Sequence, residues 1–93
     1  MYSEKATIIN AVGLHARPAS DFIHKAKEFS SKIKIENLNC PEDGKVNAKS
    51  IVGVLSLAVP QGNEVEITAT GDDEEEAVKA LVAMIKDGFG EEV

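Results

Sequence analysis

The sequence is poor in the residues that build disulfide-linked, base-stacking and membrane-spanning proteins. Its single cysteine, Cys40, excludes an internal disulfide, so we expect a reducing, cytoplasmic setting. It has no Trp, one Tyr and three Phe, too few aromatic side chains for a platform that stacks nucleic-acid bases. No apolar run approaches the roughly 18 residues of a membrane span. The first residues also lack a signal-peptide pattern, so we expect no membrane insertion.

Positive charge is also scarce, and it is unevenly distributed. Ten Lys and Arg stand against 16 Asp and Glu, which gives a net charge of −6 over 93 residues. Residues 1–50 carry a net charge of +2 and residues 51–93 a net charge of −8. This balance argues against direct nucleic-acid binding, which needs a dense basic footprint. Apolar residues make up 43% of the chain, enough for the core of one small domain, which we assign to residues 1–93.

Two kinds of hydrophobic pattern follow one another along the chain. Residues 2–9, 32–36, 45–48 and 64–70 have the composition or the alternation of strands. Apolar residues return at helical spacing over residues 16–29, 51–57 and 73–85. Residues 37–44 are rich in turn formers and predict a long hairpin tip that contains Cys40. The resulting order, β-α-β-β-α-β-α, predicts an α+β fold with an antiparallel sheet and helices on one of its faces.

The helix starts and one helix face can be assigned to particular residues. Ser50 is a plausible N-cap of the short second helix. Asp72 or Asp73 is expected to cap the last helix, in which Lys79 follows Glu75 by four residues, a favourable spacing for an ion pair. We expect the buried stripe of this helix to consist of Ala77, Val78, Leu81, Met84 and Ile85.

The octapeptide Gly13-Leu14-His15-Ala16-Arg17-Pro18-Ala19-Ser20 lies where a strand is expected to end and a helix to begin. Gly13 permits a tight turn before the helix. The start of a helix has unpaired N–H groups and the positive end of its dipole, and both attract an anion. Here Ala16 and Arg17 can supply those N–H groups, and Arg17 is the only arginine of the chain. Its guanidinium matches the oxygens of a phosphate group.

His15 is the residue in this segment that can form a covalent bond with phosphorus. The positive helix end disfavours imidazolium, so we expect a neutral ring whose nitrogen can attack a phosphorus atom. That reaction needs no metal or cofactor held by the protein and no general base. The only other histidine, His24, has no Cys/His cluster around it that would form a metal site. The pattern predicts His15 as a phosphoryl acceptor and Arg17 as the residue that stabilises the phosphate.

Two separated motifs resemble those of the HPr family, the histidine-containing phosphocarriers of the phosphoenolpyruvate-dependent sugar phosphotransferase system. The first is Gly-Leu-His-Ala-Arg-Pro-Ala from Gly13. The second runs from Asn47 to Leu57, and the likeness covers essentially the whole chain. The chain departs from the family in its longer hairpin tip. It also has Val12 where many relatives have a small polar residue that can cap the first helix, so capping here is weaker or comes from the region of His15.

The resemblance implies a fold and a carrier function. The fold is an open-faced β-sandwich, four antiparallel strands covered on one face by three helices. Nδ1 of His15 accepts a phosphoryl group from phosphorylated enzyme I and passes it to IIA domains of sugar permeases. The amides of Ala16 and Arg17 bind the group and the Arg17 side chain steadies it. On this reading the protein is not an enzyme but a substrate of kinases and phosphotransferases, and we expect a monomer.

The second motif implies regulation and docking. Ser50 resembles the serine that an HPr kinase/phosphorylase modifies in HPr of the Gram-positive type. The resemblance implies that the modified protein then acts with a catabolite-control transcription factor. Part of the short helix, Ile51, Val52 and Leu55, resembles an exposed apolar docking patch, although core packing is the ordinary explanation for such residues. We expect the flanking lysines to steer acidic partners; they are Lys25, Lys27 and Lys49.

Two other functions remain open from the sequence. The nitrogen-related branch of the phosphotransferase system shares both motifs, and only Pro18 and the Ser56-Leu57 ending favour the sugar branch. A small phosphatase of acylphosphatase size has a similar length and also cradles phosphate with an arginine, but it needs no histidine nucleophile. Substitution of His15 distinguishes a carrier from such a phosphatase.

Overall fold

The computed structural model describes residues 1–90 and has the seven main elements that the sequence predicts. The strands are β1 (Tyr2–Thr7), β2 (Lys32–Asn37), β3 (Lys45–Asn47) and β4 (Glu64–Thr70). The helices are α1 (Ala16–Ala26), α2 (Ile51–Ser56) and α3 (Glu74–Lys86). Two single 3-10 turns complete the described chain, η1 (Pro41–Asp43) in the hairpin tip and η2 (Gly88–Gly90) after α3.

The four strands form one antiparallel sheet in the order β1-β4-β2-β3. Strand β4 lies in the centre, paired with β1 through Tyr2 to Thr7 and with β2 through Lys32 to Asn37. The short strand β3 pairs with only half of β2, through Lys34, Ile35 and Glu36. Strands alternate between a buried and a solvated face because successive side chains point to opposite sides of a sheet. This alternation confirms the half-buried strands predicted over residues 32–36 and 64–70.

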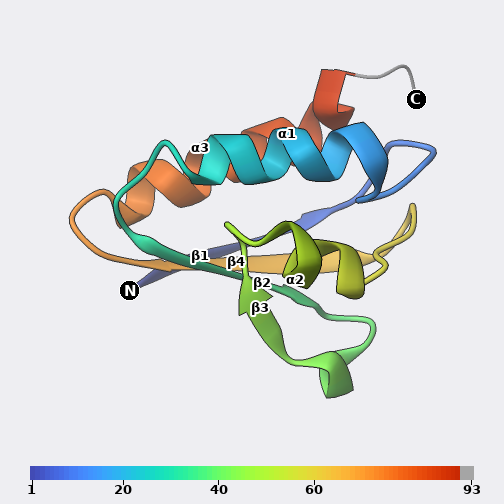
Figure 1. Cartoon of the computed structure of the whole chain (residues 1–93), viewed down its shortest axis with the longest axis horizontal. Coiled ribbons are helices and arrows are strands. Elements are labelled where there is room, and N and C mark those ends of the chain that lie inside the picture. Colours follow the sequence, from blue (N-terminus) through green and yellow to red (C-terminus); the bar gives the residue numbers. More distant parts are fainter. Residues whose placement is uncertain (91–93) are drawn as a thin grey trace.

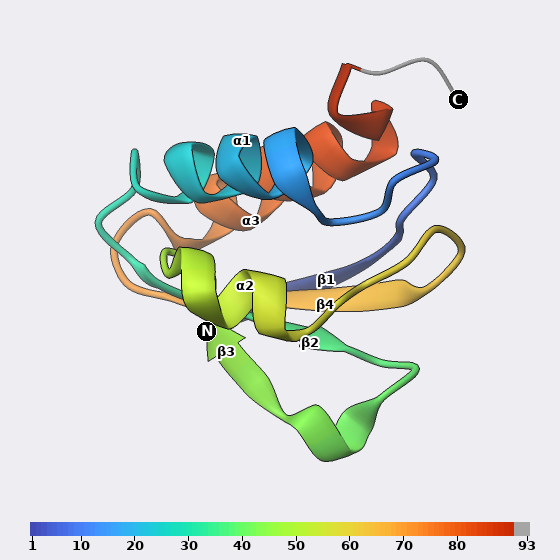
Figure 2. The same ribbon diagram turned by 45° about the vertical axis from the view of Figure 1, so that its right-hand side comes forward.

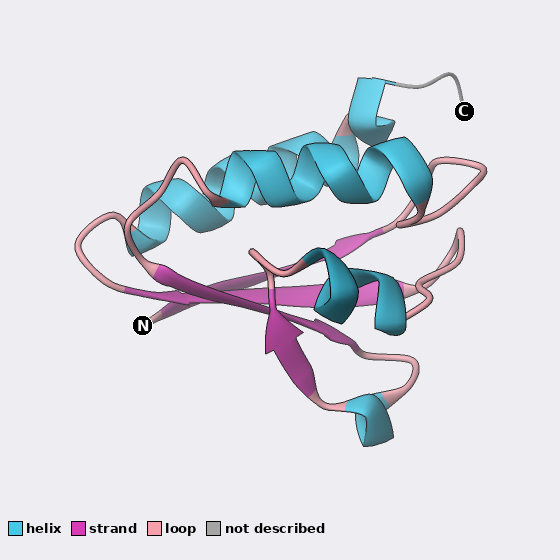
Figure 3. Cartoon of the chain, viewed as in Figure 1, coloured by secondary structure: helices cyan, strands magenta, loops and turns pink. Residues whose placement is uncertain are grey.

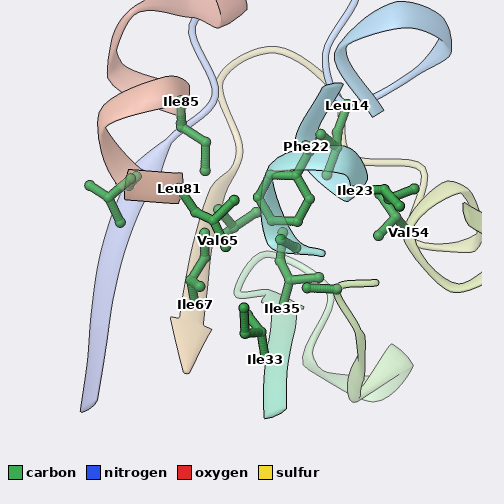
Figure 4. Close-up of a cluster of buried hydrophobic side chains, with 14 of the residues drawn as sticks. Leu14, Phe22, Ile23, Ile33, Ile35, Val54, Val65, Ile67, Leu81 and Ile85 are labelled. Atoms are coloured by element: carbon green, nitrogen blue, oxygen red, sulfur yellow. The ribbon is translucent and has the colours of Figure 1, made fainter. Parts of the chain in front are cut away.

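The three helices cover one face of this sheet and leave the other face open (Figure 1). Helices α1 and α3 run side by side, and α2 lies beside α1 above the β2 and β3 part of the sheet (Figure 2). Figure 3 shows the same layers coloured by element type. Figure 4 shows the core between the layers, where Phe22 of α1 and Leu81 of α3 lie in one cluster with the sheet residues Ile35 and Ile67. The architecture is therefore the predicted α+β open-faced sandwich.

Three local expectations need correction. The first strand ends at Thr7 and not at residue 9, and the first helix ends at Ala26 and not at residue 29. In α3 the buried residues are Ala77, Val78, Leu81, Val82 and Ile85, so Val82 is fully packed while Met84 is only half-buried. Helix α3 packs against β1, β4 and α1, so more of its circumference is buried than the predicted stripe.

Asp73 precedes α3, as predicted, but its side chain does not cap that helix. Its carboxylate instead accepts hydrogen bonds from the backbone N–H groups of Ser30 and Ser31, at 2.9 and 3.0 Å, and from the Ser31 hydroxyl. These hydrogen bonds lower the pKa of Asp73 below its ordinary value. Asp73 therefore ties the turn between α1 and β2 to the start of α3, a link across more than 40 residues of sequence.

Candidate functional site

The loop that carries His15 is fastened to the neighbouring segment at residues 59–60. The buried side chain of Leu14 enters the core, and its N–H donates to the carbonyl oxygen of Val59 at 2.9 Å. Before it, Asn10 donates from Nδ2 to the carbonyl oxygen of Gly13 at 2.8 Å. Gly13 has φ +70°, and a Cβ at this position would lie 2.3 Å from the Val59 oxygen. Only glycine fits there, so the tight turn predicted before His15 is confirmed.

His15 occupies the N-cap position of α1 in extended backbone conformation, with φ −131° and ψ 163°. Its own side chain makes no capping hydrogen bond, and the residue is half-buried. The backbone therefore fixes the position of His15 at the start of α1, while the imidazole ring stays available to a reactant. Capping by Val12 is impossible, since this exposed residue is apolar.

The first residue of α1, Ala16, has φ +51°, in the left-handed region. This conformation costs a residue with a Cβ about 1–2 kcal/mol relative to the right-handed region. The sequence does not signal it, because alanine normally favours a regular helix start. The strain is located next to the histidine, where it fixes the direction in which the first N–H groups point.

The start of α1 leaves donors free for an anion. Among residues 1–90, no carbonyl or side chain accepts a hydrogen bond from the N–H of Ala16 or Arg17. The next residue, Pro18, has no N–H, and the first intrahelical bond runs from Ala19 to the His15 carbonyl at 3.5 Å. The side chain of Arg17 is exposed and forms no ion pair with the described carboxylates. The predicted donors are thus gathered beside His15.

Helix α2 presents the second predicted set of residues. Oγ of Ser50 accepts a hydrogen bond from the N–H of Gly53 at 3.2 Å, so the predicted N-cap is confirmed. The exposed fractions of Ile51, Val52 and Leu55 are 45%, 75% and 40%, values that core residues do not have. Core packing, the ordinary explanation, is therefore wrong for these three side chains. Val54 is the buried member of the helix.

The three flanking lysines differ in their surroundings. Lys49 is half-buried, and its Nζ donates to the carbonyl oxygen of Phe29 at 2.7 Å. Lys25 contacts Glu28 at 3.4 Å, a weak exposed pair. Lys27 is exposed and has no ion pair with a described residue. Lys27 is thus the most available charge of the three.

Residues 1–90 hold no group of three or more His, Cys, Asp and Glu side chains arranged to bind a metal ion. No helix in the same range is long and apolar enough to cross a membrane.

Comparison with known proteins places these features in a family. The family model described as the PTS HPr component phosphorylation site matches residues 2–87. HPr-like protein Crh of Bacillus subtilis is 43% identical over 88 residues, which cover 94% of this chain and 98% of that protein. Phosphocarrier protein HPr of Haemophilus influenzae is 44% identical over 86 residues, which cover 91% of this chain and 95% of that one. The chain spans only 17% of another relative, the multiphosphoryl transfer protein of Haemophilus influenzae, at 40% identity.

Solved structures agree with the sequence comparison. The crystal structure of HPr-C-His from Thermoanaerobacter tengcongensis superposes with a TM-score of 0.92 at 54% identity, with both chains fully covered. A structure described as an HPr dimer from the same organism gives a TM-score of 0.74 at 54% identity, over 98% of this chain and all of that one. The matched family model and the whole-length likeness show that this chain belongs to the HPr family, the phosphocarrier proteins of the phosphotransferase system.

Proposed function

We propose that Nδ1 of His15 accepts a phosphoryl group from phosphorylated enzyme I and donates it to IIA domains of sugar permeases. The observation that carries this proposal is the position of His15. It is half-buried at the N-terminus of α1, beside two N–H groups that no described residue engages. This arrangement combines a nucleophile with an anion-binding helix start.

The transfer needs little from the protein beyond position and charge. The lone pair of Nδ1 forms the new N–P bond while the bond between phosphorus and the donor's histidine breaks, and the donor nitrogen keeps that electron pair. In the second transfer phosphorylated His15 is the donor. The lone pair of a IIA histidine forms the new N–P bond while the N–P bond of His15 breaks, and Nδ1 keeps that electron pair. The N–H groups of Ala16 and Arg17 and the guanidinium of Arg17 hold the phosphoryl oxygens. The chain is regenerated after two transfers, which makes it a carrier and not a catalyst.

Intact-mass spectrometry tests the proposal directly. The protein is incubated at neutral pH with enzyme I, magnesium and phosphoenolpyruvate, beside His15→Ala and, as a matched control, His24→Ala. We expect one acid-labile phosphoryl group on the native chain and on His24→Ala, and none on His15→Ala. No adduct on the native chain, with an enzyme I that phosphorylates a known HPr, would contradict the sugar-branch function. The same assay with the enzyme I of the nitrogen branch then tests the alternative.

We further propose that Ile51, Val52 and Leu55 form the docking surface for these partners, with Lys27 and Lys49 at its border. Exposed apolar side chains on one short helix are typical of a partner site. Val52→Asp, the substitution of the most exposed of the three, should raise the KM for the protein as a substrate of enzyme I. Thr7→Asp, on an exposed position of β1, should leave it unchanged. Equal effects of the two substitutions would argue for a general charge effect.

Ser50 is proposed as the site of regulation by an HPr kinase/phosphorylase, with a catabolite-control transcription factor as the partner of the modified form. Its hydroxyl lies at the N-terminus of α2, where the helix dipole favours a phosphate, and next to the docking surface, where the added charge repels acidic partners. Ser50→Ala should abolish modification by the kinase. Ser56→Ala, at an exposed serine of the same helix, should not. Modification of both variants would place the phosphate elsewhere.

We also propose that the carrier works as a cytoplasmic monomer, because several partners must reach one small docking surface in turn. Light scattering after gel filtration tests the monomer at the concentrations used for transfer. A mass of twice 9.9 kDa would show a dimer instead.

A further inference from the structure

A basic hollow lies outside the His15 site, at the corner where the α1–β2 turn meets β2 and the end of β3. Its volume is about 410 Å³. The side chains that give it its charge are Lys32 and Lys34 of β2 and Lys49 of the β3–α2 connection, and no Asp or Glu lines it. We call this the basic hollow. Three of the ten Lys and Arg residues of a chain with net charge −6 are thus gathered in one place.

The strand pattern fixes which way two of these lysines point. Lys32 and Lys34 are exposed and alternate with the buried Ile33 and Ile35, so they point to the open face of the sheet, away from the helices. Lys34 lies directly opposite Asn47 in the β2–β3 register. The carboxamide oxygen of Asn47 accepts a hydrogen bond from the Lys49 N–H at 2.9 Å, which leaves its amide nitrogen as a further donor.

The charges of the hollow have no internal counter-ion. Among residues 1–90, none of the ammonium groups of Lys32, Lys34 and Lys49 forms an ion pair with a carboxylate. Nζ of Lys49 is drawn inward by its hydrogen bond to the Phe29 carbonyl, which uses one of its three donors. The carboxylate of Asp73, which contacts the same turn, is engaged by Ser30 and Ser31. Three lysines therefore line one hollow with no ion pair to neutralise them among the described residues.

From this geometry we propose that the basic hollow binds a small phosphate-bearing anion with at least two negative charges, independently of His15. Such a ligand neutralises the mutual repulsion of the lysines and accepts hydrogen bonds from several donors at once. The volume accommodates a small metabolite, and the concave shape favours it over an extended acidic segment of a protein.

NMR titration of the ¹⁵N-labelled full chain with inorganic pyrophosphate, at low ionic strength, tests the proposal, since salt screens exposed charges. We expect saturable amide shifts at Ser31, Lys34 and Lys49 in the native chain and equally in His15→Ala. The double variant Lys32→Gln/Lys34→Gln should weaken binding roughly fivefold or more, as two exposed charge contacts are lost. Lys45→Gln, at an exposed lysine of β3 outside the hollow, is the matched control.

The outcomes are distinct. Shifts confined to Ala16 and Arg17 and lost in His15→Ala would assign all anion binding to the His15 site and overturn the proposal. An equal loss of pyrophosphate binding in Lys45→Gln would show a general effect of charge, and this result would also overturn the proposal. A parallel titration with ribose 5-phosphate distinguishes an organic phosphate from an inorganic one as the preferred ligand. None of these results depends on phosphotransfer from enzyme I.

Discussion

Replacement of Gly13 by alanine tests whether the His15 loop is held by the close approach of two backbone segments. An added Cβ would lie 2.3 Å from the Val59 carbonyl oxygen and 2.9 Å from Cα of Pro60. Both contacts are with backbone atoms, which no side-chain rotation relieves. The loop must therefore move away from residues 59–60, and the hydrogen bond from Leu14 to Val59 is stretched or broken.

The expected cost of Gly13→Ala in free energy of unfolding has three parts. A residue with a Cβ at φ +70° costs about 1–2 kcal/mol. Loss of the Leu14 hydrogen bond adds about 1 kcal/mol, and displacement of the loop adds more. Gly62→Ala is the matched control, because Gly62 also has positive φ, +94°, but nothing lies within 4 Å of its Cβ position. Its substitution should cost only the conformational part, about 1–2 kcal/mol.

Urea denaturation compares the free energies of unfolding of the two variants. The rate at which enzyme I phosphorylates His15 shows whether the loop still works. We expect Gly13→Ala to lower the free energy of unfolding by about 3 kcal/mol or more, and to slow phosphorylation. Gly62→Ala should lose less stability and be phosphorylated at the native rate. Equal losses of stability would refute the close approach at Gly13 as the reason why this loop holds its shape.

Three further predictions concern the core, a carboxylate and a helix cap. Phe22→Ala should lower the free energy of unfolding by about 3–5 kcal/mol, as measured in urea, because the ring is fully buried; Phe29→Ala, at a half-buried ring, should cost less. Hydrogen bonds from the Ser31 hydroxyl and the Ser30 amide hold the pKa of Asp73 below its ordinary value of 3.8. The contribution of Asp73 to the stability of the fold is therefore present above pH 3.8 and is lost as the pH falls through the lowered pKa. Asp73→Asn should therefore lower the Tm at pH 7 and flatten its decline below about pH 4, whereas an unchanged profile would exclude this role. Ser50→Ala should cost about 1 kcal/mol through the lost N-cap, measured in urea, and Ser56→Ala clearly less.

Several features followed from residues close together in the sequence. The alternation around Ile33 and Ile35 predicted a strand with one buried face. Ser50 was predicted to cap its own helix, and Lys79 to pair with Glu75, which it contacts at 2.8 Å. Such interactions span three or four residues, so chain order alone decides whether they can form. The His15 motif is local in the same sense, since its donors are the next residues along the chain.

Long-range contacts decided the rest. Asp73 has the position of a helix cap, yet its carboxylate binds the turn at Ser30 and Ser31 because the fold brings that turn within reach. The left-handed φ of Ala16 arises where the loop is pinned to residues 59–60, and nothing in its neighbours requires it.

The basic hollow has the same origin. Lys32 and Lys34 belong to one strand, but Lys49 lies well beyond them along the chain, and the sequence does not bring the three together. Pairing of β2 with β3 places them around one concavity. The sequence by itself determined the elements, the nucleophile and its local donors, because these depend on neighbours along the chain. Only the tertiary structure decided which distant groups share a surface, because that depends on strand order and register.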